Sequence, residues 1–120
     1  MSPTIVSQNN RVYLVTRSPE GSTIPTTVLQ VIINAIDYGM ILSEAVNHPR
    51  VHYQGLPNRI SQEHEAISAA TVRGLKIRGY QLRSPRREWG AAESILVDLQ
   101  TGVMHGVNNI RKPAGKAVAY

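Results

Sequence analysis

The feature that most constrains this fold is a helical segment that is apolar on nearly all sides. Between positions 28 and 36 the apolar residues are Val28, Leu29, Val31, Ile32, Ile33, Ala35 and Ile36. Pro25 suits the first turn of a helix and Gly39 suits its end, so the sequence predicts a helix over residues 25–38. Because apolar side chains cover most of its circumference, we expect this helix to be packed on more than one side.

The length of the chain limits how that helix can be buried. The sequence has 120 residues, with 42% hydrophobic and 18% charged residues, a composition typical of one globular domain. A chain of this size buries roughly two-thirds of its unfolded surface when it folds alone, so a missing partner would matter. The stretch 28–36 is broken by Gln30 and Asn34 and is too short to span a bilayer. We therefore expect no membrane partner.

Charge and cysteine content exclude several classes of site. There is no cysteine, which excludes a disulfide framework, a thiol nucleophile and a cysteine-based metal site. The formal net charge is +5, with basic clusters at 73–78 and 83–87. Few aromatic residues accompany these clusters, so we expect a solvated basic surface and no nucleic-acid partner. Anion or nucleic-acid binding through the 83–87 loop is the alternative.

The remaining pattern predicts a mixture of helices and strands. A hairpin is expected from strands over 4–6 and 11–16, and a terminal hairpin from strands over 94–99 and 103–107. The other predicted elements are a helix over 42–46, an extended segment over 50–54, a strand over 60–63, a helix over 66–78 and a strand over 80–83. In the 66–78 helix we expect four residues to point inward: Ile67, Ala70, Val72 and Leu75. Such an order is typical of an α+β fold in which helices cover sheets.

Metal and phosphate sites are not favoured by the residue spacing. His48 and His52 have the four-residue spacing of a helical zinc pair, but Pro49 between them breaks the helix that would place both on one face. The other two histidines, His64 and His105, are far from this pair in sequence, so we expect no metal and no cofactor. The loop residues Ser18, Ser22 and Thr23 lack the glycine and lysine pattern of a phosphate-binding loop.

Two pairs of charged residues could serve function but are more simply explained by structure. Glu63 and Glu65 could flank a substrate, but two acids close to a predicted helix start are typical partners of the helix dipole. Asp37 and Arg50 could form an ion pair, which would be a scaffold contact. We expect the structural reading for both pairs.

Several segments together resemble one enzyme family. Ser22–Met40, followed by Glu44–Val46 and by Pro49–Pro57, resembles the long core helix and next signature of the small subunit of gamma-glutamyltransferases, also called gamma-glutamyltranspeptidases or glutathione hydrolases. The other matching pieces are Met1–Val6, Trp89-Gly90, Ala92-Glu93, Gly106 and Arg111. The resemblance covers residues 1–120 as one C-terminal part of that subunit, and it is dense up to Pro57.

The resemblance implies a fold and a reaction. The family belongs to the N-terminal nucleophile hydrolases, whose four-layer αββα sandwich this chain would form only in part. Its members cleave the γ-glutamyl amide of glutathione and pass the glutamyl group to water or to an acceptor amine. A new N-terminal threonine is the nucleophile, activated by its own α-amine. The implied partners are the upstream part of the small subunit, the large subunit and γ-glutamyl compounds. Bacterial relatives are often periplasmic or extracellular, and the compartment of this chain stays open.

No residue of this sequence matches the family's nucleophilic threonine. The resemblance places that threonine upstream of Met1, together with a pair of serines that help to bind the γ-glutamyl group. Ser2 aligns beside the first strand, and Pro3 restricts its backbone, so we do not expect Ser2 to replace the threonine. We therefore expect no catalytic residue here and no activity of the chain alone. The alternative is a non-catalytic binding or complementing module of the same fold.

One loop of the family's site is present in altered form. The family usually reads Gly-Ser-Pro-Gly-Gly, and the last two glycines supply the oxyanion-hole amides. This chain has Arg17-Ser18-Pro19-Glu20-Gly21, so the candidate oxyanion-hole and substrate-binding residues are Glu20 and Gly21. Glutamate adds bulk and negative charge where glycine is usual, and losing one such donor costs about 2.7–4 kcal/mol. Asn109 and Ile110 also depart from the aspartate and proline common in the family.

Overall fold

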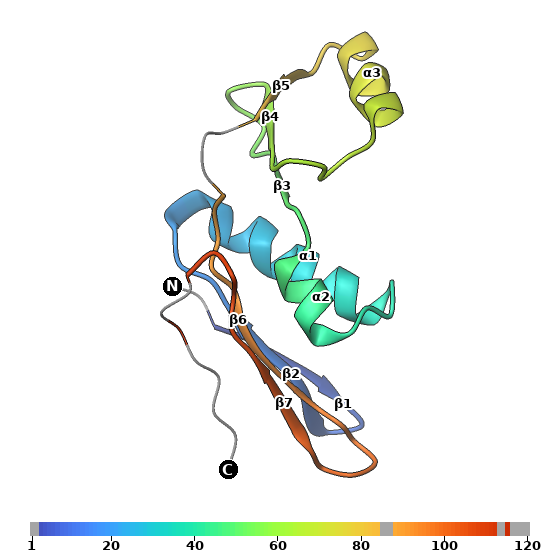
Figure 1. The fold of residues 1–120 in the computed structure, drawn as a ribbon, viewed down its shortest axis with the longest axis vertical. Coiled ribbons are helices and arrows are strands. Elements are labelled where there is room, and N and C mark those ends of the chain that lie inside the picture. Colours follow the sequence, from blue (N-terminus) through green and yellow to red (C-terminus); the bar gives the residue numbers. More distant parts are fainter. Residues whose placement is uncertain (1–2, 85–87, 113–114, 116–120) are drawn as a thin grey trace. The chain divides into compact units, whose positions relative to one another are not determined.

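The computed structural model describes residues 3–84, 88–112 and 115 (Figure 1). The chain divides into two compact units, the first comprising Met1–Asn47 with Trp89–Tyr120 and the second comprising His48–Glu88. Both contain helices and strands, which confirms the predicted mixture. Within the described residues, no helix is long and apolar enough to cross a membrane.

The first unit is built on a four-stranded antiparallel sheet in the order β1-β2-β6-β7. Its strands are β1 Thr4–Gln8, β2 Arg11–Arg17, β6 Glu93–Val97 and β7 Met104–Val107. Asn9 and Asn10, which join β1 to β2, have φ of 51° and 58°, as a two-residue hairpin turn requires. Both hairpins predicted from the sequence are therefore confirmed. The register shifts between Val6 and Ser7, which leaves Tyr13 without a partner on β1.

Helices cover one face of this sheet (Figure 1). They are the short 3-10 helix η1 Gly21–Thr23, α1 Ile24–Ile36 and α2 Leu42–Asn47. The buried core between helices and sheet consists of Leu14, Val31, Ala35, Leu42, Ala45, Val46 and Ala92. The long helix ends two residues earlier than predicted, at Ile36, and Gly39 then reverses the chain with φ of 63°.

Helix α1 is packed mainly on one side. Val31 is fully buried, whereas Leu29 is 54% exposed and Ile36 is 44% exposed. Tyr38 and Ile41, which follow the helix, are also exposed. The expectation that this helix is packed on several sides is therefore not met within the described residues, and an apolar face stays open to solvent.

The second unit is a small three-stranded sheet in the order β3-β4-β5. Its strands are β3 Val51–His52, β4 Arg59–Gln62 and β5 Gln81–Arg83, and α3 Ala69–Ile77 connects the parallel strands β4 and β5. The helix predicted from residue 66 begins only at Ala69, because the Ser68 hydroxyl accepts a hydrogen bond from Thr71 N (3.1 Å) and caps it. No residue of α3 is fully buried, and Ala70, predicted to point inward, is exposed.

Candidate functional site

The loop that connects β2 to α1 has a backbone that favours glycine at two successive positions. Glu20 has φ 91° and ψ 54°, and Gly21 has φ 56°. A positive φ is uncommon for any residue other than glycine. Glu20 therefore keeps the left-handed backbone that suits the family's glycine, although its own side chain disfavours it.

Hydrogen bonds fix this turn through its carbonyl groups. The Glu20 carbonyl accepts from Thr23 N (3.3 Å) and from the Thr23 hydroxyl (2.7 Å), and Ile24 N donates to the Gly21 carbonyl. In the described part of the chain, no acceptor is found for the backbone N–H groups of Glu20 and Gly21, and both residues are exposed. Two neighbouring, exposed N–H groups are thus left without an acceptor in the described part of this loop.

The Glu20 carboxylate has a defined partner. Its Oε2 accepts a hydrogen bond from Gly90 N at 2.9 Å. The two residues lie 70 positions apart in sequence, and sequence reasoning did not foresee the contact. A carboxylate bound to a backbone N–H makes a charge-assisted hydrogen bond, so one oxygen of the carboxylate expected beside the loop is directed at this N–H.

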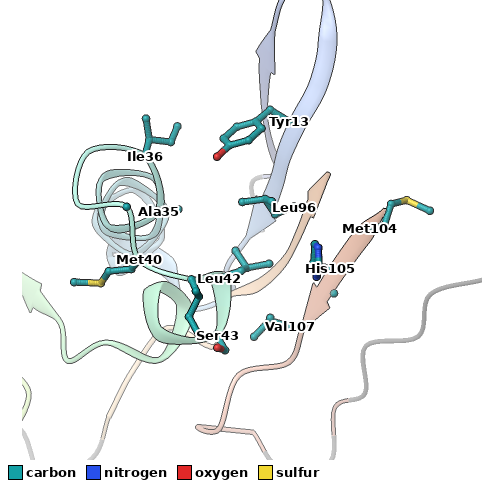
Figure 2. Close-up of a pocket in the computed structure, with 13 residues that line it drawn as sticks. Tyr13, Ala35, Ile36, Met40, Leu42, Ser43, Leu96, Met104, His105 and Val107 are labelled. Atoms are coloured by element: carbon teal, nitrogen blue, oxygen red, sulfur yellow. The ribbon is translucent and has the colours of Figure 1, made fainter. Parts of the chain in front are cut away.

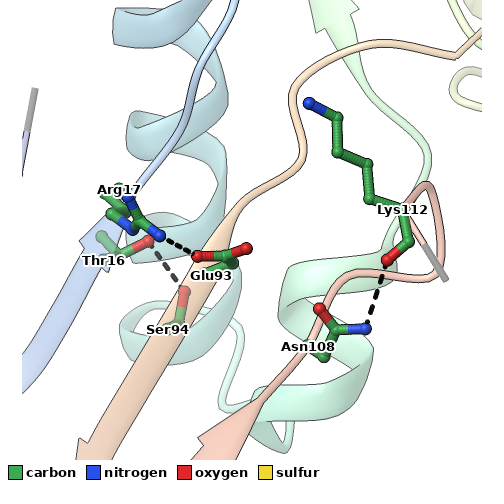
Figure 3. Close-up of polar contacts among 6 residues, drawn as sticks. All are labelled: Thr16, Arg17, Glu93, Ser94, Asn108 and Lys112. Carbon is green, nitrogen blue, oxygen red and sulfur yellow. Dashed lines mark hydrogen bonds and ion pairs between the residues drawn. The ribbon is translucent and has the colours of Figure 1, made fainter. Parts of the chain in front are cut away.

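Two side-chain pairs join the end of β2 to the start of β6 (Figure 3). The Thr16 and Ser94 hydroxyl oxygens are 2.8 Å apart, and both residues are buried. Beside them the Arg17 guanidinium pairs with the Glu93 carboxylate, and both of these side chains are partly exposed. These cross-strand pairs were also missed, because the only signal for them was the expectation of strands over 11–16 and 94–99.

A buried asparagine anchors the segment after β7. Asn109 is completely buried, its Nδ2 donates to Val46 O (3.3 Å), and its Oδ1 accepts from Arg111 N (2.8 Å). The neighbouring Asn108 Nδ2 donates to Lys112 O at 3.4 Å, and Figure 3 draws this contact. The departure from the family's aspartate at position 109 thus supplies a donor that aspartate lacks.

A hollow of about 940 Å³ lies between the α1–α2 connection and the sheet. Figure 2 shows Tyr13 and Leu96 pointing from the sheet toward this connection. The remaining lining residues are mostly apolar and include Ile36, Met40, Ile41, Leu42, Met104 and Val107. The hollow is a groove of mixed polarity that begins beside Ile36 at the end of α1.

The other residues weighed as candidates do not assemble into a site. His48 follows the end of α2 and His52 lies in β3, so no helix face carries both. Among the described residues, no group of three or more histidine, aspartate or glutamate side chains could hold a metal ion. Of the loop hydroxyls, Ser18 donates to Pro19 O (3.0 Å) and Thr23 donates within the turn. Ser2 and residues 85–87 of the basic loop lie outside the described residues.

The paired-acid expectation needs correction. Glu63 is buried and its carboxylate accepts from Arg50 N (2.9 Å), whereas Glu65 is exposed beside His64. Because α3 begins only at Ala69, neither acid lies in its first turn, and the proposed dipole interaction is wrong. Asp37 and Arg50 belong to different units, and the ion pair between them stays a prediction.

The comparison with known proteins decides the family. The family model Gamma-glutamyltranspeptidase matches residues 1–119. The chain belongs to this family. The glutathione hydrolase proenzyme of Escherichia coli (strain K12) is 40% identical over 120 residues, which are 100% of this chain and 20% of that protein. This chain therefore spans about a fifth of the length of that relative.

Solved structures of the family share the fold. A mutant of the Helicobacter pylori gamma-glutamyltranspeptidase superposes with a TM-score of 0.87 at 46% identity, covering 93% of this chain and 61% of that chain. The Pseudomonas nitroreducens enzyme gives 0.86 at 31% identity, covering 100% and 62%. The predicted fold, an incomplete α+β part of an N-terminal nucleophile hydrolase, is confirmed by this likeness.

Proposed function

We propose that these 120 residues are the C-terminal part of the small subunit of a glutathione hydrolase and carry its oxyanion loop. The observation that supports this most directly is the turn at Glu20 and Gly21. It keeps the left-handed backbone of a glycine pair and leaves two adjacent N–H groups without an acceptor among the described residues. The similarity of the whole chain to glutathione hydrolase proenzymes supports the assignment.

In the proposed reaction a nucleophile attacks the carbonyl carbon of a γ-glutamyl amide. The carbonyl oxygen becomes an oxyanion, which accepts hydrogen bonds from the N–H groups of Glu20 and Gly21. The amine then leaves with the proton that the base took from the nucleophile, and water or an acceptor amine attacks the acyl-enzyme through a second oxyanion of the same kind. The same loop therefore serves both steps. This mechanism requires no cofactor.

We propose that the nucleophile and the contacts to the γ-glutamyl group of the substrate lie in parts of the enzyme other than these 120 residues. No residue of this sequence matches the family's nucleophilic threonine, so we propose that the chain alone is inactive. The proposed partners are the upstream part of the small subunit and the large subunit. The length of the relatives, about five times that of this chain, supports this.

A chimera tests the proposal. The 120 residues replace the matching segment of the Escherichia coli relative, and the purified protein is assayed with a chromogenic γ-glutamyl anilide. We expect saturable release of the aniline by the chimera and none by the 120-residue chain. A chimera that melts as cooperatively as the parent but releases no aniline would contradict the proposal. Saturable release by the isolated chain would contradict its inactivity.

The second candidate function is a non-catalytic complementing module. The open apolar face of α1 and the adjoining groove favour it, because Leu29, Ile36 and Ile41 are exposed and would be covered by another polypeptide. Size-exclusion chromatography with light scattering tests the need for a partner. A monomer with a cooperative melting transition would count against an obligate partner.

A further inference from the structure

The two residues that depart from the family's glycine pattern contact the same segment of the chain. Arg17, at the start of the loop, pairs with Glu93. Glu20, near its end, accepts a hydrogen bond from Gly90 N. Both departures therefore join the 17–21 loop to residues 90–93.

The 90–93 segment is a firm anchor. Ala91 is 3% exposed and Ala92 is fully buried in the core of the first unit. Ala92 N also donates to Gly90 O at 2.8 Å, which closes a tight turn. Glu93 begins β6 and stands in register opposite Arg17. A side chain that binds residues 90–93 is therefore fixed in position with respect to the sheet of the first unit.

A tether of this kind explains why Glu20 can keep a left-handed backbone. Such conformations persist in residues other than glycine where the surroundings over-determine them. Glu20 is held at its carbonyl by Thr23 and at its carboxylate by Gly90. The Gly21 N–H shares a peptide plane with the Glu20 carbonyl, and the Glu20 N is bonded to the same Cα that carries the tethered side chain, so the contacts restrict the direction of both N–H groups.

We propose that Arg17 and Glu20 form a two-point clamp that holds the 17–21 loop on residues 90–93, and that Glu20 is a positioning residue through its side chain. In the family both positions are usually glycine, which has no side chain to hold the loop. Here a salt bridge and a charge-assisted hydrogen bond hold it. The catalytic consequence of the clamp rests on the proposed function above, but the clamp itself does not.

Hydrogen exchange at Gly90 tests the clamp on the 120-residue chain. Glu20→Gln keeps an acceptor of the same length, and Glu20→Asn tolerates the left-handed backbone but is one methylene shorter. We expect the Gly90 amide, followed by NMR, to exchange at least about tenfold faster in Glu20→Asn and Glu20→Gly than in the unchanged chain. Glu20→Gln should stay within about threefold, and Arg17→Gln should raise the rate about twofold.

The amide of Leu14 in the core of the first unit serves as the internal reference, because global unfolding accelerates it together with Gly90. Gly90 exchange that is equal in all Glu20 variants, while Leu14 stays protected, would overturn the clamp. Where the isolated chain protects neither amide, the same exchange is measured by mass spectrometry in the Escherichia coli chimera. An inactive chimera in which Gly90 protection still depends on Glu20 would overturn the proposed function and leave the clamp standing.

Discussion

Thr16 and Ser94 face each other on β2 and β6, 78 positions apart in sequence, with buried hydroxyl oxygens 2.8 Å from each other. They lie one position inside the Arg17–Glu93 pair, at the end of the sheet from which the 17–21 loop leaves. A buried hydroxyl costs free energy unless it is hydrogen-bonded. This pair therefore satisfies two polar groups and at the same time fixes the register of β2 on β6.

Replacing one hydroxyl of this pair should be more harmful than replacing both. Thr16→Val keeps the shape of the side chain but leaves the Ser94 hydroxyl unpaired, so we expect a loss of about 1–3 kcal/mol in the free energy of unfolding. Adding Ser94→Ala should recover part of the loss. Urea denaturation measures both, with the exposed Ser7→Ala as the control expected within about 0.5 kcal/mol. Additive effects of the two substitutions would contradict the coupling.

Asn109 should not tolerate the aspartate that its family commonly has. Asn109→Asp removes the donor to Val46 O and places a carboxylate oxygen against that carbonyl. We expect destabilisation by about 1–3 kcal/mol in urea denaturation. The neighbouring Asn108→Asp is the matched control, because Asn108 is only half-buried, and it should change stability by about 0.5 kcal/mol or less. Equal effects of the two substitutions would argue against the buried amide contact.

The two sides of α1 should respond differently to truncation. Val31 is fully buried in the core, so Val31→Ala should cost about 1.5–3 kcal/mol through lost burial and a cavity. Leu29 is 54% exposed, and Leu29→Ala should stay within about 0.5 kcal/mol because alanine is also the better helix former. Thermal and urea denaturation of the isolated chain measure both. A Leu29→Ala cost equal to that of Val31→Ala would show that this face is covered in solution, for example by a second copy.

The sequence predicted local elements of the fold better than contacts between residues that lie far apart in the chain. The apolar run over 28–36 predicted α1 within two residues, and Asn9-Asn10 marked a hairpin because both residues accept a positive φ. Such signals lie within one element. The contacts of Glu20 with Gly90 and of Thr16 with Ser94 depend on strand register across 70 or more positions, which no local pattern encodes.

The misplaced start of α3 has a local cause of a different kind. Ser68 caps the helix through its own hydroxyl, and that signal competed with the apolar pattern that began at residue 66.

The candidate site was predictable only as a loop, through the resemblance of residues 17–21 to the family motif. The contacts that hold this loop could not be predicted. Without knowledge of their partners Glu93 and Gly90, Arg17 and Glu20 only depart from the family's glycines.

Asp98, in the turn between β6 and β7, should titrate at acid pH. Hydrogen bonds from the Thr101 side chain and from the backbone N–H groups of Gln100 and Thr101, with a smaller contribution from the charge of His105, hold the pKa of Asp98 below its ordinary value of 3.8. A lowered folded-state pKa contributes stability that is present above the unfolded value and is lost as pH falls through the folded value. The effect is therefore confined to pH below about 4.

Thr101→Val removes the largest of these contributions, so the pKa of Asp98 should rise toward 3.8. NMR titration of the Asp98 carboxyl carbon measures the change, and Ser7→Ala on β1 should leave the titration where it is. A pKa of Asp98 that is the same with threonine and with valine at position 101 would rule out the hydroxyl as the main cause.

Catalysis by the Escherichia coli chimera should depend on the length of the side chain at position 20. If the Glu20 carboxylate aims the oxyanion N–H groups by holding Gly90 N, then Glu20→Asn should lower kcat about tenfold, because losing one donor altogether costs about 100- to 1000-fold. The KM should hardly change, since the oxyanion exists only in the transition state and intermediates. Glu20→Gln should keep kcat within about threefold, and Arg17→Gly with Glu20→Gly, which restores the family's loop, should also be active. Equal kcat values for the asparagine and glutamine variants would mean that the side chain does not position the loop during turnover.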